Sequence, residues 1–287
     1  MTAERGPATP ERPGSSPRDG GGTLTTRDGT RLAHRIHDSR TPSAARSTPL
    51  LFLHGLAGHQ GEWDDVLPRF LADGHKVVTY DARGHGDSTR SPRDMTRAAC
   101  AGDAVALIDH LSLAPVTLIG QSLGGHTALL TAAAHPDLIR SLVLIEAGPA
   151  QADPGLPQGV GAWMDSRPER FDSRAHAVDF FGHEAWARGL EEREDGWYPK
   201  VERDRMIAAV TELSERSYWQ EWAQVRCPTL VVRGERGTMP ESEQTGMRAR
   251  RPEGTTLEVI PDAGHDVHLD QPERLHAAIS AFLKAEE

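Results

Sequence analysis

Ser122 lies in a turn between a predicted strand and a predicted helix, and this turn constrains the fold more than any other stretch. The apolar run 115–119 contains β-branched residues and predicts a buried strand, while 127–134 is rich in helix-forming residues. In the Gly-Gln-Ser-Leu-Gly sequence between them, the glycines on either side of the serine let strand and helix approach without a Cβ clash. Short glycine motifs recur by chance, but this placement is specific. We expect the serine hydroxyl to stand above the edge of a sheet, on a strained backbone.

Strands and helices alternate on either side of this turn. Continuous apolar runs predict buried strands at 49–53, 75–80, 115–119, 141–145, 229–233 and 256–260. Helical spacing predicts helices at 62–72, 93–111 and 127–134, with a last helix opened by Pro272. Strict alternation implies an α/β fold, in which a mostly parallel central sheet is flanked by helices on both faces.

The alternation stops between residues 148 and 224. This stretch has no buried-strand run but carries amphipathic segments at 175–190 and 203–218. We therefore expect a helical cap over 148–224, inserted after the sixth strand of a single α/β core that comprises 23–147 and 225–287.

The N-terminal residues divide into a tail and a hairpin. Residues 1–22 are mostly Pro, Gly, Ser and Arg, with almost nothing to bury, and predict a disordered tail. The runs 23–26 and 31–37 flank Asp28-Gly29, and glycine accepts the positive φ that a tight turn requires. These two runs therefore predict a hairpin.

Charge and composition exclude some partners. The formal net charge is -10, whereas binding to nucleic acid requires a surplus of Lys and Arg, so we expect no nucleic-acid partner and no anionic membrane. No apolar run is long enough to span a bilayer, and residues 1–22 lack the apolar core of a signal peptide. Cys100 and Cys227 lie in or beside predicted buried segments. We interpret both as reduced packing residues of a cytoplasmic protein.

Four motifs follow the predicted strands in order. They are His-Gly-Leu-Ala-Gly at 54–58, Asp-Ala-Arg-Gly-His-Gly-Asp-Ser at 81–88, the serine turn at 120–125 and Pro-Asp-Ala-Gly-His at 261–265. On these motifs, the chain from about Thr23 onward resembles the α/β-hydrolase fold superfamily, and within it the serine hydrolases with a cap after the sixth strand. The motifs are specific for the fold and much less specific for the substrate. The resemblance implies no cofactor.

Ser122 and His265 are the candidate nucleophile and base. A serine hydroxyl is a poor nucleophile at neutral pH, and histidine suits as its base because the histidine pKa lies near the working pH. The chain has 14 histidines, so position decides. His265 lies between the last strand and the last helix, at the carboxyl edge of the sheet, and matches the family motif. His268 is the nearest alternative, and we expect it to pack or to point to solvent.

The acid that should orient His265 departs from the commonest family pattern. Relatives often carry an aspartate three residues beyond the glycine of a Gly-Glu-x-Asp motif, and here Gly237 takes its place. Glu146 is our candidate, because it ends the sixth strand at the same sheet edge. Haloalkane dehalogenases and certain lactone hydrolases similar to this chain keep their acid there. Glu235, one residue past the seventh strand, stays open as an alternative.

Two main-chain N–H groups are the candidate oxyanion hole. The turn geometry points to the N–H of Leu123, the residue after the nucleophile, and the loop after the third strand points to the N–H of Leu56. We expect His54 to hold that loop through hydrogen bonds, and residues 81–88 to be loop architecture with a glycine-rich turn.

Aromatic residues of the predicted cap are the only indication of the substrate. The ten are Trp163, Trp186, Trp197, Trp219, Trp222, Phe171, Phe180, Phe181, Tyr198 and Tyr218. We expect most to serve packing and two or three to face the pocket, which favours a small apolar or aromatic substrate. Charges from 165 to 205 alternate in sign and predict a solvated face.

Together these residues predict a serine hydrolase that cleaves a carboxylic ester or lactone through an acyl-enzyme, with a Ser122-His265-Glu146 triad. Hydrolysis of a carbon–carbon bond, perhydrolysis, and a receptor that binds a small molecule without turnover stay open. Serine at position 122 disfavours epoxide hydrolase and haloalkane dehalogenase chemistry, which in similar proteins needs an aspartate there. No metal site is expected, because the histidine pairs lack a Cys or carboxylate cluster at ligand spacing. The sequence leaves the oligomeric state open.

Overall fold

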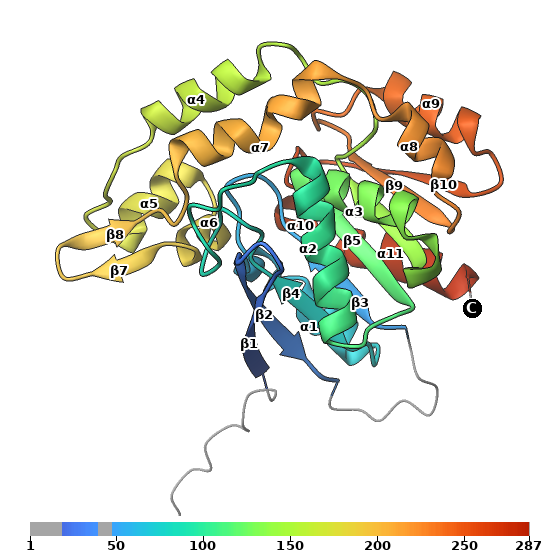
Figure 1. Ribbon diagram of the computed structural model, residues 1–287, viewed down its shortest axis with the longest axis horizontal. Coiled ribbons are helices and arrows are strands. Elements are labelled where there is room, and N and C mark those ends of the chain that lie inside the picture. Colours follow the sequence, from blue (N-terminus) through green and yellow to red (C-terminus); the bar gives the residue numbers. More distant parts are fainter. Residues whose placement is uncertain (1–18, 40–47, 287) are drawn as a thin grey trace, which may run out of the picture.

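A computed structural model describes residues 19–39 and 48–286, arranged around an eight-stranded sheet (Figure 1). Its strands are β1 (Asp19–Thr25), β2 (Arg31–His37), β3 (Leu50–Leu53), β4 (Val77–Tyr80), β5 (Val116–Gln121), β6 (Ile139–Ile145), β9 (Thr229–Gly234) and β10 (Thr255–Ile260). Their order across the sheet is β1-β2-β4-β3-β5-β6-β9-β10. β2 pairs antiparallel with both β1 and β4, and the remaining neighbours pair parallel. The predicted mostly parallel sheet is confirmed.

Helices cover both faces of this sheet. In Figure 1, α2 and α3 lie in front of the sheet, and α11 lies behind it. The core helices and turns are η1 (Gln60–Trp63), α1 (Leu67–Ala72), α2 (Arg97–His110), α3 (Leu123–Ala134), η2 (Pro136–Leu138), α9 (Glu241–Arg250), α10 (Val267–Asp270) and α11 (Pro272–Ala285). The helix predicted over 62–72 is divided between η1 and α1, and α2 is shorter than the predicted 93–111.

Consecutive strand residues face two different hydrophobic cores. Leu51 is buried in the same core as Leu107 of α2, whereas its neighbour Phe52 is buried in the other core, with its ring centroid 5.5 Å from that of Phe70 in α1. A strand that is buried on both faces has no polar positions to alternate with apolar ones. This is why continuous apolar runs located the central strands.

The N-terminal boundary differs from the prediction. β1 begins at Asp19, so residues 19–22, which were assigned to the disordered tail, pair with β2. Strand pairing uses main-chain groups and needs no apolar side chain, so a run of glycines on an edge strand escapes a criterion based on burial. The hairpin around Asp28-Gly29 is confirmed, with Gly29 at φ +86°. The rest of the predicted tail, residues 1–18, lies outside the described residues.

The segment between β6 and β9 is mostly helical. It contains α4 (Leu156–Ser166), α5 (Arg174–Phe181), α6 (Glu184–Arg188), β7 (Glu191–Arg193), β8 (Gly196–Tyr198), α7 (Arg203–Glu215) and α8 (Trp219–Gln224). Figure 1 shows α4 and α7 side by side above the sheet. The antiparallel β7–β8 hairpin was not predicted. Its strands are three residues long and are not buried, so they leave no apolar run to detect.

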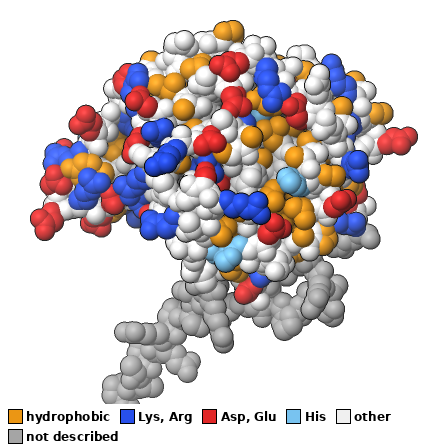
Figure 2. Space-filling view, viewed as in Figure 1, with side chains coloured by type: hydrophobic (Ala, Val, Ile, Leu, Met, Phe, Trp, Pro, Cys, Tyr) orange, Lys and Arg blue, Asp and Glu red, His pale blue; other side chains and the backbone are white. Residues whose placement is uncertain are grey.

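The surface carries charges of both signs, and Figure 2 shows them interspersed over one face of the molecule. Within the inserted segment many of them pair, including Arg203 with Asp165 at 2.6 Å and Arg174 with Glu184 at 2.8 Å. The predicted solvated face is confirmed. Among the described residues, no helix is both long and apolar enough to cross a membrane. Cys100 and Cys227 are buried and unpaired, as predicted.

Candidate active site

The serine turn has the strained geometry that its sequence predicts. Ser122 has φ 50° and ψ -118°, a left-handed conformation that side chains rarely adopt. A Cβ atom at Gly120 would lie 2.5 Å from the carbonyl oxygen of Gly124, and one at Gly124 would lie 2.3 Å from that of Leu53. Both positions therefore require glycine for the strand and helix to pack this closely. The Ser122 N–H donates to the Ile145 carbonyl at 2.8 Å, which ties the turn to β6.

A cavity of about 900 Å³ opens at this turn, at the carboxyl edge of the sheet. Ser122, Glu146 and His265 all line it, although they lie far apart in the sequence. The inserted segment supplies many of the other lining residues. Three of its ten aromatic residues line the cavity, namely Trp163, Trp186 and Trp219, in agreement with the expectation that two or three would face the pocket.

His265 contacts a buried carboxylate. Its Nδ1 lies 3.3 Å from Oε2 of Glu146, whose side chain is fully buried. Glu146 also accepts hydrogen bonds from the main-chain N–H groups of Gly234, Thr238 and Met239. Burial alone would raise the pKa of Glu146, but these hydrogen bonds and the one from His265 outweigh burial and hold the pKa below its ordinary value. The carboxyl group is therefore ionised at neutral pH.

Thr238 was not singled out from the sequence, yet its hydroxyl lies between these two side chains. Oγ1 is 2.8 Å from His265 Nδ1 and donates to Glu146 Oε2 at 3.2 Å. A proton on Nδ1 can thus be donated to the Thr238 hydroxyl, to Glu146, or to both. The only sequence signal for this residue is its place directly after Gly237, where relatives often carry their acid.

The alternative acid, Glu235, points elsewhere. Its side chain is exposed, and its Oε2 accepts a hydrogen bond from the Asp262 N–H at 3.1 Å. The space of the usual family acid is also occupied, because a Cβ atom at Gly237 would lie only 2.0 Å from Glu146 Oε1. Glu146, which follows β6, thus places its carboxylate in the space beside Gly237. This geometry favours Glu146 over Glu235.

Two buried histidines hold the candidate oxyanion loop through hydrogen bonds. The Ala57 N–H donates to His85 Nε2 at 3.1 Å, and the Ala82 N–H donates to His54 Nε2 at 2.9 Å. Burial and the neighbouring His54 lower the pKa of His85 to about 3, so it is a neutral acceptor. The expected structural role of His54 is confirmed.

The N–H groups of Leu56 and Leu123 donate no hydrogen bond within the described part of the chain. The two residues line the same cavity as Ser122. A Cβ atom at Gly55 would lie 3.5 Å from that of Ser122, so the loop before Leu56 packs directly against the nucleophile turn. Two unpaired main-chain donors beside the serine are the arrangement that an oxyanion hole requires.

The contact between Ser122 and His265 is less complete. Within residues 19–39 and 48–286, the Ser122 hydroxyl makes no hydrogen bond to His265, so this contact stays a prediction. Such bonds often tighten only when substrate binds.

His268 is fully buried, 3.6 Å from Glu62, and lies outside the cavity lining, which confirms that it packs.

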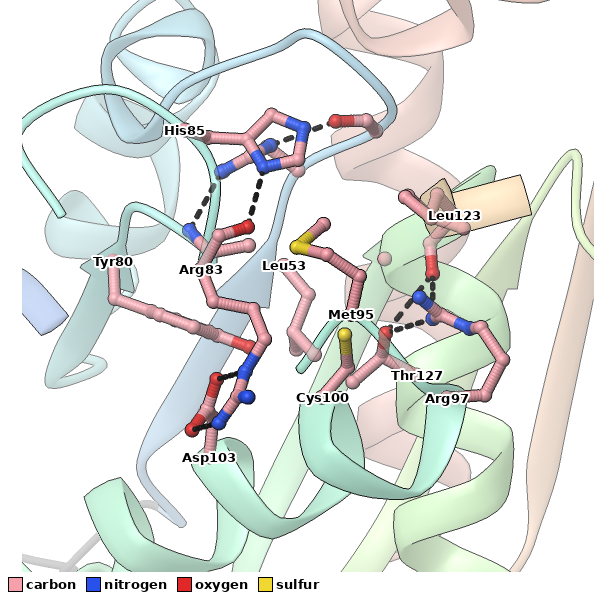
Figure 3. A pocket seen from close by; sticks show the side chains of 15 residues that line it. Leu53, Tyr80, Arg83, His85, Met95, Arg97, Cys100, Asp103, Leu123 and Thr127 are labelled. Carbon is pink, nitrogen blue, oxygen red and sulfur yellow. Dashed lines mark hydrogen bonds and ion pairs between the residues drawn. The ribbon is translucent and has the colours of Figure 1, made fainter. Parts of the chain in front are cut away.

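A second, much smaller cavity of about 20 Å³ lies behind the serine turn and has room for about one water molecule. Figure 3 shows Arg97 reaching the Thr127 hydroxyl and the Leu123 carbonyl, the latter at 3.0 Å. In the same view the Arg83 guanidinium donates two hydrogen bonds to the Asp103 carboxylate, each with an N–O distance of 2.6 Å. These buried polar groups fix the start of α3 and the loop after β4, and the cavity is too small for a substrate.

The family model of the alpha/beta hydrolase fold matches residues 48–272 of this sequence. The chain belongs to this family. It is 28% identical over 256 residues to the sn-1-specific diacylglycerol lipase ABHD11 of Mus musculus, covering 82% of this chain and 80% of the lipase. It is 24% identical over 238 residues to the (E)-2-((N-methylformamido)methylene)succinate hydrolase of Acinetobacter baylyi, covering 82% and 90% of the two chains.

The solved structure of E-2-(acetamidomethylene)succinate hydrolase superposes with a TM-score of 0.78 at 21% identity, over 93% of this chain and 100% of that chain. At this identity the superposition supports the fold alone. Membership of the family and these relatives support a hydrolase. The relatives act on different bonds, so they do not select the bond that this chain cleaves.

Proposed function

We propose that this protein is a serine hydrolase that cleaves a carboxylic ester or lactone through an acyl-enzyme. The observation that carries the proposal is the shared cavity, which brings together a serine on a strained turn, a histidine in contact with a buried carboxylate, and two unpaired main-chain donors. Each of these features is common elsewhere, but together around one cavity they form the arrangement that acyl transfer uses.

In the proposed mechanism, the Ser122 hydroxyl attacks the carbonyl carbon while His265 Nε2 takes its proton. Glu146 and the Thr238 hydroxyl hold Nδ1–H, which fixes the tautomer and stabilises the imidazolium that forms. The N–H groups of Leu56 and Leu123 donate to the oxyanion. His265 then protonates the leaving alkoxide. A water molecule, deprotonated by His265, hydrolyses the acyl-enzyme and restores Ser122.

The inserted segment acts as the cap in this proposal. Three of its tryptophans line the same cavity as Ser122, which favours an apolar or ring-containing group on the substrate. The ester-cleaving lipase among the relatives supports an ester bond, although its name concerns that protein alone. Two buried, unpaired cysteines support a cytoplasmic protein.

The proposal is tested by proton release in a pH-stat, over a panel of short and aromatic esters and of small and macrocyclic lactones. Turnover that is lost in Ser122→Ala is the expected result, and the panel shows whether esters or lactones are preferred. If Ser122→Ala turns over every ester and lactone as fast as the wild type, the serine mechanism is wrong. Binding without serine-dependent turnover would favour a receptor.

A further inference from the structure

Two arginine side chains are buried in the described part of the chain, and only one of them has a carboxylate partner. Arg83 donates two hydrogen bonds to Asp103. Arg97 is 2% exposed, and the ion pairs of the described residues do not include it. Glu212 accepts a hydrogen bond from the main-chain N–H of Arg97, at 3.2 Å, and none from its side chain. Because a buried charge is costly unless it is paired, the Arg97 guanidinium lacks the compensation that buried charges usually have.

The guanidinium of Arg97 contacts the start of α3 instead. Its Nη2 donates to the Leu123 carbonyl at 3.0 Å and to the Thr127 hydroxyl (Figure 3). Its Nε donates to His126 Nδ1 at 3.4 Å. All three acceptors are neutral, since burial, and after it the charge on Arg97, holds the pKa of His126 well below its ordinary value. Neutral donors could make such hydrogen bonds, so these contacts do not account for the charge itself.

Leu123 links this charge to the proposed reaction. Its N–H is a proposed oxyanion donor, and its carbonyl accepts from Arg97. The path from the guanidinium to the Leu123 carbonyl, across that residue to its N–H, and along one hydrogen bond to the oxyanion has three steps of about 3 Å each, so the charge lies within roughly 10 Å of the oxyanion. Because α3 begins at Leu123, the positive end of its dipole adds to the same field.

The charge on Arg97 acts on groups on both sides of the serine turn. Burial is the main cause of the low pKa of His126 and of His85, and the charge on Arg97 lowers both further. His126 lies in α3, and His85 accepts the Ala57 N–H of the oxyanion loop. The small cavity beside Arg97 has room for about one water molecule, so solvent screens this field little.

We propose that Arg97 is the counter-charge of the oxyanion, a positioning residue that acts through Leu123. Its positive charge has no partner in the resting protein and is balanced in part when the substrate carbonyl oxygen becomes negative. This inference rests on the proposed function, which supplies the oxyanion. Arg97 touches neither the substrate nor the reacting atoms.

Two substitutions separate the charge of Arg97 from its hydrogen bonds. Arg97→Lys keeps a charge and a donor for the Leu123 carbonyl, whereas Arg97→Gln keeps a donor without the charge. One charge at roughly 10 Å, at an effective dielectric constant of about 20, changes a rate about ten- to twentyfold. The oxyanion exists only in the transition state, so we expect Arg97→Gln to lower kcat by this factor and to leave KM within about twofold. Arg97→Lys should stay within about threefold of the wild-type kcat.

Rates are measured at pH 7.5 on the preferred ester of the pH-stat panel and corrected for the folded fraction from urea unfolding. If Arg97→Lys and Arg97→Gln lose kcat alike, or if Arg97→Gln keeps the wild-type kcat, the proposal is overturned.

Arg251 provides a matched control. Like Arg97, it donates to a main-chain carbonyl and to a threonine hydroxyl, those of Cys227 at 2.8 Å and Thr229 at 3.1 Å, and it forms no ion pair among the described residues. Thr229 begins β9, at the end of the strand away from Ser122. Arg251→Gln should therefore reduce the free energy of unfolding and leave kcat within about twofold. A loss of kcat equal to that of Arg97→Gln would overturn the proposal.

A boronic acid tests the negative charge directly. Phenylboronic acid adds to a serine hydroxyl as a tetrahedral anion, whereas benzyl alcohol binds as a neutral ligand. In Arg97→Gln, the inhibition constant of phenylboronic acid should rise about ten- to twentyfold and that of benzyl alcohol should stay within about twofold. Equal changes in the two constants would overturn the proposal.

A second pair of variants carries the test if Arg97→Gln does not fold. Thr127→Asp places a carboxylate beside the Arg97 guanidinium and cancels its charge, and Thr127→Asn is the neutral variant of the same shape. We expect kcat of Thr127→Asp to be about tenfold below that of Thr127→Asn, with equal KM, and equal kcat values would overturn the proposal.

The wild type separates this inference from the proposed function. Absence of Ser122-dependent turnover overturns both. Ser122-dependent turnover with an unchanged kcat in Arg97→Gln overturns the counter-charge alone and leaves the hydrolase.

Discussion

Replacing Glu146 with glutamine tests the acid of the proposed triad. His265 Nδ1 lies 3.3 Å from Glu146 Oε2. Two unit charges at that separation interact by about 5 kcal/mol at an effective dielectric constant of about 20. Because the His265 side chain is 36% exposed, solvent screening reduces this to roughly 2 to 3 kcal/mol. The charge on His265 develops in the transition state, so we expect kcat to fall about 30- to 160-fold.

The substitution also affects stability, which the assay has to separate from catalysis. The two oxygens of Glu146 accept hydrogen bonds from the N–H groups of Gly234, Thr238 and Met239. A glutamine amide has one acceptor oxygen. If that oxygen faces Thr238 and Met239, the Gly234 N–H loses its acceptor at a cost of about 1 to 3 kcal/mol. Urea unfolding, followed by intrinsic fluorescence, measures this loss and gives the folded fraction for each rate.

Initial rates on the preferred ester from the pH-stat panel then give kcat for wild type, Glu146→Gln and Glu235→Gln. Glu235 is exposed and contacts the Asp262 N–H, so its variant should remain within about twofold of wild type. The reasoning is refuted if Glu146→Gln keeps most of the wild-type kcat while Glu235→Gln loses it by orders of magnitude.

Three further predictions concern the surroundings of His265. Gly237→Asp should lower the midpoint of urea unfolding and reduce the free energy of unfolding by roughly 2 kcal/mol or more, because its Cβ would lie 2.0 Å from Glu146 Oε1. Adding Gly237→Asp to Glu146→Ala should instead raise kcat above that of Glu146→Ala alone. An unchanged urea midpoint for Gly237→Asp alone would contradict the close packing of Gly237 against Glu146. Thr238→Val removes the hydroxyl that lies 2.8 Å from His265 Nδ1 and should lower kcat by about three- to tenfold, whereas Thr238→Ser should stay near wild type. Its hydrogen bonds hold the pKa of Glu146 below the ordinary value of a glutamate, so its contribution to stability is present above that ordinary pKa and is lost as the pH falls through the folded pKa. The difference in unfolding free energy between wild type and Glu146→Gln should therefore shrink below about pH 4.5, and a constant difference down to pH 2 would contradict the hydrogen-bonded, ionised carboxylate.

The sequence correctly predicted the strands and the turn that side-chain burial and backbone geometry determine. The central strands are covered on both faces, so 49–53 and 115–119 appear as apolar runs, and the turn at Ser122 needs glycines at fixed distances. It was wrong at residues 19–22, where glycines form a strand without burying side chains. It also missed the exposed β7–β8 hairpin. Both failures concern strands that main-chain pairing alone defines.

The acid illustrates a different limit. The sequence shows that Gly237 lacks a carboxylate, but it contains no measure of whether Glu146 or Glu235 reaches the vacated space. That depends on the directions of β6 and of the loop after β9, which the structure supplies through the 2.0 Å approach at Gly237. Thr238 escaped notice for the same reason, since a hydroxyl in a loop is an ordinary feature of any surface.

The inserted segment enters and leaves the α/β core at neighbouring strands, β6 and β9, which pair directly in the sheet. The proposed catalytic side chains and oxyanion donors all lie outside it, while the tryptophans of the cavity wall lie within it. The proposed catalytic residues and the tryptophans of the cavity wall are therefore encoded in separate parts of the chain, the former on either side of the insertion and the latter within it. Substitutions, or the exchange of the whole segment by recombination at residues 148 and 224, would change the cavity wall and leave the sequence of the proposed catalytic residues intact.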